Sequence, residues 1–314
     1  MDETSSRQAS SVPNQQGTGG VTARPIVQAM PARGVGVRTA RRRRVRYGNL
    51  LANVVFAAIG LGFALPLLWM LLAAFDTHAT NSLRWPAWGL NNFTQDFKQN
   101  LIVQPFLNSM IISGVTTVIT TLFGLMAAYP ISRGYIPFKR PLLYSVLFAT
   151  GLPVNMLIVP VYSMFVSWNL TDSLTWAGVF LAATSLPFAI WILKNFIDAI
   201  PMELEEAAQV DGASAIQIIR WITLPLATPG IVVNAMLTFL GAWGYFLVPY
   251  IFIQSQDKMP FAVTIYGFQA AYGQISYGPL AAAALIFSAP VIILYWAASR
   301  HLIGAFNFGG GLQG

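Results

Sequence analysis

AIPMELEEAAQVDGASAIQIIRWITLPLATP, residues 199–229, is the one long amphipathic, acid-bearing segment in a chain that is otherwise largely apolar. Pro201 followed by three glutamates predicts a helix start, because proline fits the first turn and carboxylates there face the positive end of the helix dipole. Asp211-Gly212 predicts the end of that helix, since glycine accepts the positive φ of a sharp turn. A second short helix is expected from Ser214, and Leu224-Pro225 is expected to end it.

The composition predicts a protein that crosses a membrane several times. Its mean hydropathy is +0.59, and only 9% of its residues are charged, far below the roughly 25% of soluble globular proteins. From this high hydropathy and low charge we expect an all-α integral membrane protein. The absence of cysteine excludes disulfides and thiol chemistry.

Six apolar runs are long enough to span, since about 20 helical residues cross a bilayer core. They cover about residues 50–75, 105–131, 142–165, 176–196, 228–253 and 279–299. The third run contains Pro153 and Pro160, and proline frees a backbone carbonyl inside a helix. A structural kink explains these prolines, and the alternative is that Asn155 beside them lies on a translocation path.

The basic residues predict the orientation of these spans. With the N-terminus inside, 15 of the 18 Lys and Arg residues fall in the cytoplasmic tails and loops, and only Arg84, Lys98 and Lys258 lie outside. Cytoplasmic loops of membrane proteins carry this excess of Lys and Arg. Both termini and the 199–225 loop are therefore expected in the cytoplasm.

The two ends of the chain flank the predicted six-helix domain, 49–303. Residues 1–48 are expected to be a disordered cytoplasmic tail, because residues 1–40 have almost no large apolar side chains and cannot offset the entropy of ordering. The arginine cluster at 41–46 could be a nucleic-acid or targeting element, but a positive-inside anchor that touches anionic lipid headgroups explains it better. We expect no nucleic-acid partner. Residues 304–314 form the predicted cytoplasmic C-terminal tail.

The central stretch also carries a gapped motif. Glu206-Ala207-Ala208, then Gly212, Ile222 and Leu224-Pro225 resemble the EAA motif of ABC importer permeases at all its defining positions and spacings. The resemblance runs from about Leu50 to the C-terminus. Upstream, LPFAIW at 186–191 and NFID at 195–198 are similar to the carbohydrate (MalG-like) branch of the family.

This resemblance implies a type I ABC importer (MetI-like) permease fold in the bacterial inner membrane. It implies a cytoplasmic ATPase dimer that binds ATP and Mg, a second homologous permease and an extracytoplasmic solute-binding protein, with no cofactor in this chain. The 199–225 loop would dock on the ATPase, with Glu206 as the polar anchor and Gly212 as the turn. The implied ATPase-coupling residues are Glu205, Glu206, Ala207, Ala208, Asp211, Gly212, Ile222, Leu224 and Pro225.

The resemblance further implies a sugar, specifically an oligosaccharide, as the imported substrate; a polyol, a glycerol-phosphate and an amino-acid-like solute are the alternatives. Candidates for the substrate path are Asn155, Trp243 and Tyr245. The glycines around Trp243 can be explained by helix packing, while Trp243 and Tyr245 could instead stack on a sugar. The external loop 254–278 is expected to contact the solute-binding protein.

Functions in two other classes lack the residues that they need. The sequence has no Gly-x4-Gly-Lys-Ser/Thr loop to hold ATP phosphates, and His78 and His301 fall on opposite predicted membrane sides, so they make no joint metal site. An ATP-independent carrier or channel normally keeps ionisable groups inside the membrane, and a membrane-embedded enzyme needs clustered carboxylates or histidines. Transport without catalysis by this chain is the better interpretation.

Overall fold

The structure is a computed structural model that describes residues 47–80, 82, 85–134, 136–270 and 276–310. The chain divides into two units, Met1–Val54 and Val55–Gly314, and the first contributes only the start of one helix to the described residues. The predicted disordered tail and its arginine cluster at 41–46 lie outside the described residues. Within the described residues, the only β pairing is an isolated bridge between Asp76 and Trp88.

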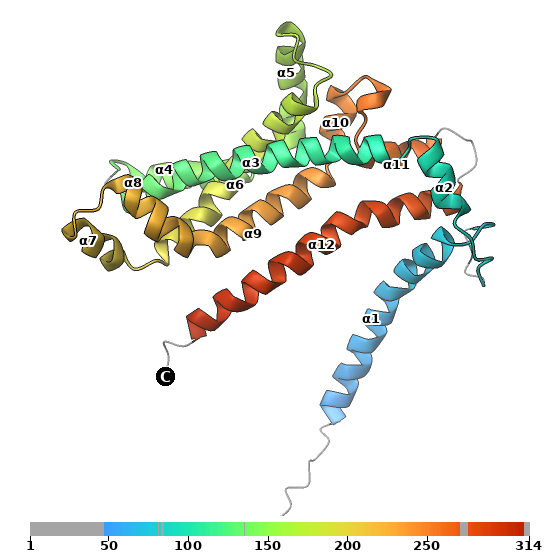
Figure 1. Ribbon diagram of the computed structural model, residues 1–314, viewed down its shortest axis with the longest axis horizontal. Coiled ribbons are helices and arrows are strands. Elements are labelled where there is room, and N and C mark those ends of the chain that lie inside the picture. Colours follow the sequence, from blue (N-terminus) through green and yellow to red (C-terminus); the bar gives the residue numbers. More distant parts are fainter. Residues whose placement is uncertain (1–46, 81, 83–84, 135, 271–275, 311–314) are drawn as a thin grey trace, which may run out of the picture. The chain divides into compact units, whose positions relative to one another are not determined.

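Helices make up nearly all of the described chain (Figure 1). They are α1 Tyr47–Ala74, α2 Asn91–Lys98, α3 Val103–Arg133, α4 Lys139–Thr150, α5 Val154–Ser167, α6 Leu174–Asp198, α7 Met202–Val210, α8 Ala215–Ile218, the π-helical segment η1 Ile219–Thr223, α9 Leu224–Trp243, α10 Leu247–Phe252, the 3-10 turn η2 Gln256–Lys258, α11 Phe261–Ala270 and α12 Tyr277–Gly310.

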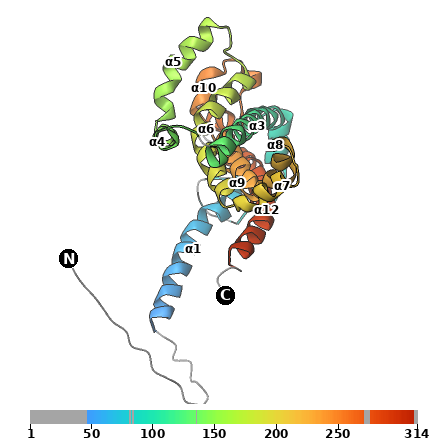
Figure 2. The same ribbon diagram turned by 90° about the vertical axis from the view of Figure 1, so that its left-hand side faces the viewer.

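Five of the described helical segments are long and apolar enough to cross a membrane, and α4 with α5 makes a sixth if this bent pair is one span. The expectation of one kinked helix over 142–165 is wrong, because α4 and α5 are separate helices bent by 89° (Figure 2). Gly151 closes α4, and Pro153 precedes the first residue of α5. Proline lacks an N–H and drives the residue before it out of helical geometry, so the chain breaks there.

The helices α3, α6 and α9 pack against one another (Figures 1 and 2). Small residues allow this close approach: a Cβ added to Gly178 would lie 3.0 Å from the carbonyl oxygen of Ile112, and one added to Gly230 would lie 2.3 Å from the ring of Phe196. The Thr116 hydroxyl donates to the carbonyl of Gly178 at 3.0 Å. In a lipid bilayer the hydrophobic effect does not drive helices together, so close packing at small residues and hydrogen bonds from hydroxyls hold them in contact.

Segments expected to be loops contain structured elements. The segment 254–278, expected to be an external loop, includes η2 and α11, and Phe261 at the start of α11 is fully buried. The segment 76–104, which separates the first two apolar runs, includes α2, whose Asn92 side chain donates to the carbonyls of Ala74 and Asp76. Polar loops in these places therefore fold back onto the helix ends.

The fifth and sixth spans also differ from the expected bounds. The helix expected over 228–253 ends earlier, at Trp243, and a short α10 follows. Helix α12 continues through the predicted domain end at 303 to Gly310, so the backbone does not break at that position. Side chains of α1 from residue 55 to 68 are all exposed, as expected for an apolar surface that meets lipid or another chain.

Candidate functional site

The loop between α6 and α9 forms two short helices at one end of the α3, α6 and α9 group (Figure 1). Pro201 precedes α7, and Glu203 and Glu205 occupy its first turn, which confirms the predicted helix start. Gly212 has a φ of +85°, a value that glycine adopts without strain, which confirms the predicted turn. The backbone N–H of Ser214 then donates to Gln217 Oε1 at 2.7 Å and caps α8.

One side of this loop is exposed and apolar. Val210 is 88% exposed, Ile216 77% and Trp221 69%, and the guanidinium of Arg220 lies 5.3 Å from the centre of the Trp221 ring. A groove of about 350 Å³ opens beside them, lined by Asp211, Gly212, Ala213, Gln217, Ile218, Trp221 and Ile222. Exposed apolar patches with polar edges are typical of protein interaction sites.

The motif residues divide between this exposed side and the interior. Glu206, Ala207, Asp211 and Gly212 are exposed, and Ala208 and Ile222 are half-buried. Glu205 is buried, with 3% of its surface exposed. Of the predicted coupling residues, Asp211, Gly212 and Ile222 line the groove, whereas Glu205 lies in the interior.

Glu205 lies in a polar cluster that joins three helical elements. Its Oε1 accepts from Arg133 Nε at 3.0 Å and from the Thr223 hydroxyl at 2.9 Å, and its Oε2 accepts from the Tyr129 hydroxyl at 3.2 Å. Arg133 also donates from Nη2 to the carbonyl of Ile200 at 2.8 Å. Charges this deeply buried require such pairing, since unpaired ions lose their hydration without compensation.

Sequence reasoning missed Tyr129, Arg133 and Thr223 as members of this cluster. The sequence marks Arg133 only by its charge at the end of a predicted span. A glutamate on the inner face of an amphipathic helix predicts a cationic partner nearby, and Arg133 at the end of α3 is a candidate for it. Which of the cytoplasmic cations pairs with it depends on tertiary contacts between positions 72 residues apart.

The prediction that Leu224-Pro225 ends the second helix is wrong. The helix runs without a break from α8 through η1 into α9. Within η1 the hydrogen bonds shift register, so that the N–H of Leu224 donates to the carbonyl of Ile219, five residues back. Pro225 follows directly, at the start of α9, where its missing N–H is tolerated because the register has just changed.

The three substrate-path candidates have different surroundings. The Tyr245 hydroxyl donates to Asn155 Oδ1 at 3.3 Å, which joins the gap between α9 and α10 to the first turn of α5. Trp243 is only 2% exposed. Its ring stacks on those of Phe239 and Phe287, and its Nε1 donates to the carbonyl of Phe287 at 3.0 Å. Because Trp243 is this deeply buried, its ring has no open face to stack on a sugar in this structure.

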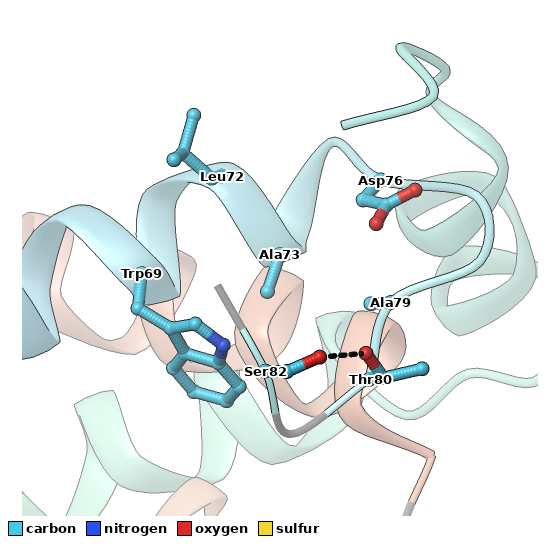
Figure 3. A pocket seen from close by; sticks show the side chains of 7 residues that line it. All are labelled: Trp69, Leu72, Ala73, Asp76, Ala79, Thr80 and Ser82. Atoms are coloured by element: carbon cyan, nitrogen blue, oxygen red, sulfur yellow. Dashed lines mark hydrogen bonds between the residues drawn. The ribbon is translucent and has the colours of Figure 1, made fainter. Parts of the chain in front are cut away.

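A small pocket at the end of α1 is too small for a solute (Figure 3). Its volume is about 10 Å³, close to the space that one water molecule needs. The ring nitrogen of Trp69 is buried and has no hydrogen-bond partner among the described residues, and Figure 3 shows it on the side of Ser82. No group of three metal-ligating side chains occurs among the residues that the structure describes.

Three comparisons with known proteins bear on this arrangement. The trehalose transport system permease protein SugB of Mycobacterium tuberculosis is 31% identical over 274 residues, which cover 85% of this chain and 97% of SugB. The diacetylchitobiose uptake system permease protein NgcG of Streptomyces coelicolor is 29% identical over 250 residues, which cover 78% of this chain and 82% of NgcG. A crystal structure of a bacterial ABC transporter involved in the import of the acidic polysaccharide alginate has a chain that superposes with a TM-score of 0.71 at 18% identity, over 82% of this chain and 97% of that one.

The superposition shows the same fold, a type I ABC importer permease with several apolar helices. A family model described as "Binding-protein-dependent transport system inner membrane component" matches residues 33–301. Its members are membrane components of transport systems rather than catalytic subunits. This multi-pass chain therefore belongs to the family of binding-protein-dependent transport system inner membrane components.

Proposed function

We propose that this chain is one permease subunit of an ATP-driven importer for oligosaccharides. The observation that carries the proposal is the exposed side of the 199–225 loop, where an acidic residue, Glu206, lies on the same loop as the apolar Val210, Ile216 and Trp221. An exposed apolar surface with a groove of this kind is typical of a site that binds a folded partner protein.

The partner that fits this surface is a cytoplasmic ATPase dimer. The chain has no phosphate-binding loop of its own, so ATP and Mg would be bound by the ATPase. Closure of the dimer around ATP would push on the loop, and the loop would pass this motion to α9 and the helices packed on it. The excess of basic residues on one side supports a bacterial inner-membrane location with both termini in the cytoplasm.

A sugar is favoured as the substrate by the relatives, whose names specify trehalose and diacetylchitobiose. Asn155 and Tyr245 offer an amide and a hydroxyl where two helices are broken, and discontinuous helices commonly supply transporter binding sites. A solute-binding protein would deliver the sugar to the external side near 254–278. A second homologous permease would complete the path, and the exposed faces of α1 and α5 give it a large apolar surface.

The proposal is tested by purifying the tagged chain in mild detergent from cells that express the complete transport system. We expect an ATPase to co-purify with the wild type and to be lost with Glu206→Lys, together with ATP-driven sugar uptake by the cells. Glu203→Lys is the matched control, because it places the same charge on an exposed position of the same helix. If the ATPase remains bound to the Glu206→Lys variant and uptake is normal, this surface is not the docking site.

A further inference from the structure

The buried cluster around Glu205 has a role that the exposed motif residues do not share. Three helical elements meet at this carboxylate: the end of α3 through Tyr129 and Arg133, α7 itself, and η1 through Thr223. Arg133 also donates to the carbonyl of Ile200 at the entry to the loop. Oε1 of Glu205 accepts from Arg133 of α3 and from Thr223 of η1, and Oε2 accepts from Tyr129 of α3. The loop is therefore fixed to two membrane helices by a single side chain.

Arg133 holds the loop at two points, Glu205 and the carbonyl of Ile200. It is the last residue of α3, its Nε donates to Glu205, and its Nη2 donates to the Ile200 carbonyl just before Pro201. One rigid guanidinium thus holds both the entry to α7 and a residue in its first turn. Arginine is suited to this because its donors lie in a fixed plane.

Thr223 extends the connection to α9. It is the last residue of η1, immediately before Leu224, and its hydroxyl donates to Glu205. A second contact supports the same end of α3, because the Ser132 hydroxyl donates to Asp198 Oδ1 at the end of α6. The two ends of the loop and the end of α3 are therefore joined by polar contacts, and Glu205 on the buried side of α7 takes part in most of them.

From these contacts we infer that Glu205 is a positioning residue that makes α7, α3 and the start of α9 move as one body. Glu205 does not touch the ATPase in this account; Glu206 does, and Glu205 passes the displacement of α7 to the membrane helices. This inference rests on the proposed function for its source of motion. It assigns the two adjacent glutamates separate tasks, one outside and one inside the same helix.

The test measures whether α7 and α3 keep a fixed separation. The chain has no native cysteine, so spin labels can be placed at Leu204→Cys on α7 and Val118→Cys on α3, which are 45% and 65% exposed. Their distance distribution is measured by pulsed electron spin resonance in the full transporter complex, without nucleotide and with ATP. For the wild type we expect one narrow distribution that ATP does not change.

Glu205→Gln removes the charge but keeps the side-chain volume. We expect it to retain the ATPase in co-purification and to broaden the label distance or make it depend on ATP, while ATP-driven transport per ATP hydrolysed falls roughly tenfold, within the range of ordinary coupling free energies. Glu206→Lys is the reciprocal control: it should lose the ATPase and keep the narrow distance. A role confined to folding would lower stability without changing transport per ATP.

Several results would overturn the inference. Loss of the ATPase from Glu205→Gln would make Glu205 a docking residue, and a narrow, ATP-independent distance in that variant would show that the cluster is not needed for the joint motion. If Glu205→Gln fails to fold, Thr223→Val removes one hydrogen bond without leaving a charge unpaired, and the same change in distance is expected of it. Wild-type protein that shows no ATP-driven transport refutes the proposed function, whereas the distance measurement still decides whether α7 and α3 are joined through Glu205.

Discussion

Glu205 and Glu206 are adjacent in sequence, yet Glu205 is 3% exposed and bonded to Arg133, while Glu206 lies on the exposed side of α7. Successive residues of a helix point about 100° apart, so one residue of offset separates an interior charge from a surface charge. The acidic run of this loop therefore contains two kinds of site. Substitutions at the two positions are expected to fail in different ways.

A side chain at Gly212 is predicted to lower the stability of the folded chain. A Cβ added to Gly212 meets nothing within 4 Å, so the penalty of Gly212→Ala comes only from its φ of +85° and is about 1–2 kcal/mol. A lower unfolding temperature in detergent and weaker retention of the ATPase are the expected results. Gly241→Ala is the control: it also meets nothing within 4 Å but lies within α9, so it should be neutral or stabilising. Equal effects of the two substitutions would contradict this explanation.

The ion pair between Arg133 and Glu205 is predicted to show strong coupling in a double-mutant cycle. Arg133→Gln leaves a buried carboxylate without its cation and should cost about 3 kcal/mol of stability. The double variant Arg133→Gln with Glu205→Gln removes both charges and should be more stable than Arg133→Gln alone. Thermal unfolding of the four proteins in one detergent measures the coupling. Simple addition of the two single effects would show that the pair does not interact.

Asp96 is predicted to make the external side of the protein sensitive to pH. Both of its carboxylate oxygens are buried without a hydrogen-bond partner among the described residues, and this burial raises its pKa from 3.8 to about 7. The folded chain then binds the proton more tightly than the unfolded chain, so stability falls as pH rises from about 4 to about 7.

Asp96→Asn should remove this pH dependence. The neutral amide avoids the buried charge, so the variant should unfold at a higher temperature than the wild type at pH 8, with the difference shrinking at pH 5. The unfolding temperature measured across this range tests the prediction. Asp257→Asn, at an exposed position, is the control and should give no such trend. A constant difference between Asp96→Asn and wild type at every pH would rule out titration as the cause.

Asp172 is predicted to hold two external segments together. It accepts from the backbone N–H groups of Gln254 and Ser255, both at 2.9 Å, and from Lys258 Nζ at 2.7 Å. Hydrogen bonds from Lys258 and Ser255 keep the pKa of Asp172 well below its usual value. Its stabilising contribution is therefore present at every pH above the ordinary carboxyl range and is lost only as pH falls through this lowered pKa.

Hydrogen exchange at Gln254 and Ser255 measures this contact. Asp172→Asn should speed exchange of these two amides roughly tenfold, as expected for losing a hydrogen bond to a charged group. The ratio of variant to wild-type rates should be the same at pH 5 and pH 8, because Asp172 stays ionised at both. Unchanged exchange in the variant would show that other contacts hold the two segments.

The parts of the site that could be predicted are those fixed by local backbone chemistry. Pro201 fixes its own φ angle and Gly212 permits a positive one, so the helix start and the turn could be inferred from the sequence. The end of the second helix could not, because the shift of hydrogen-bond register in η1 allows Pro225 to follow without a break. Apolar periodicity predicts that a helix exists better than where it ends.

Contacts between distant segments could not be predicted from the sequence, for a different reason. The contact between Tyr245 and Asn155 joins positions 90 residues apart, and the burial of Trp243 depends on Phe239 and Phe287 from two helices. An aromatic residue in a membrane span is compatible with packing and with ligand stacking alike. Only the packed arrangement separates Trp243, whose faces are covered, from Tyr245.

The continuous helix from Ala215 to Trp243 is long enough for a small tilt at one end to displace the other end by several ångströms. At 29 residues it is about 43 Å long, which exceeds the thickness of a bilayer core. A tilt of about 10° at the α8 end would displace the Trp243 end by about 7 Å for a rigid rod of this length. Because the rod stops at Gly244, that displacement would fall on the 3.3 Å contact between Tyr245 and Asn155, far from the loop where it began.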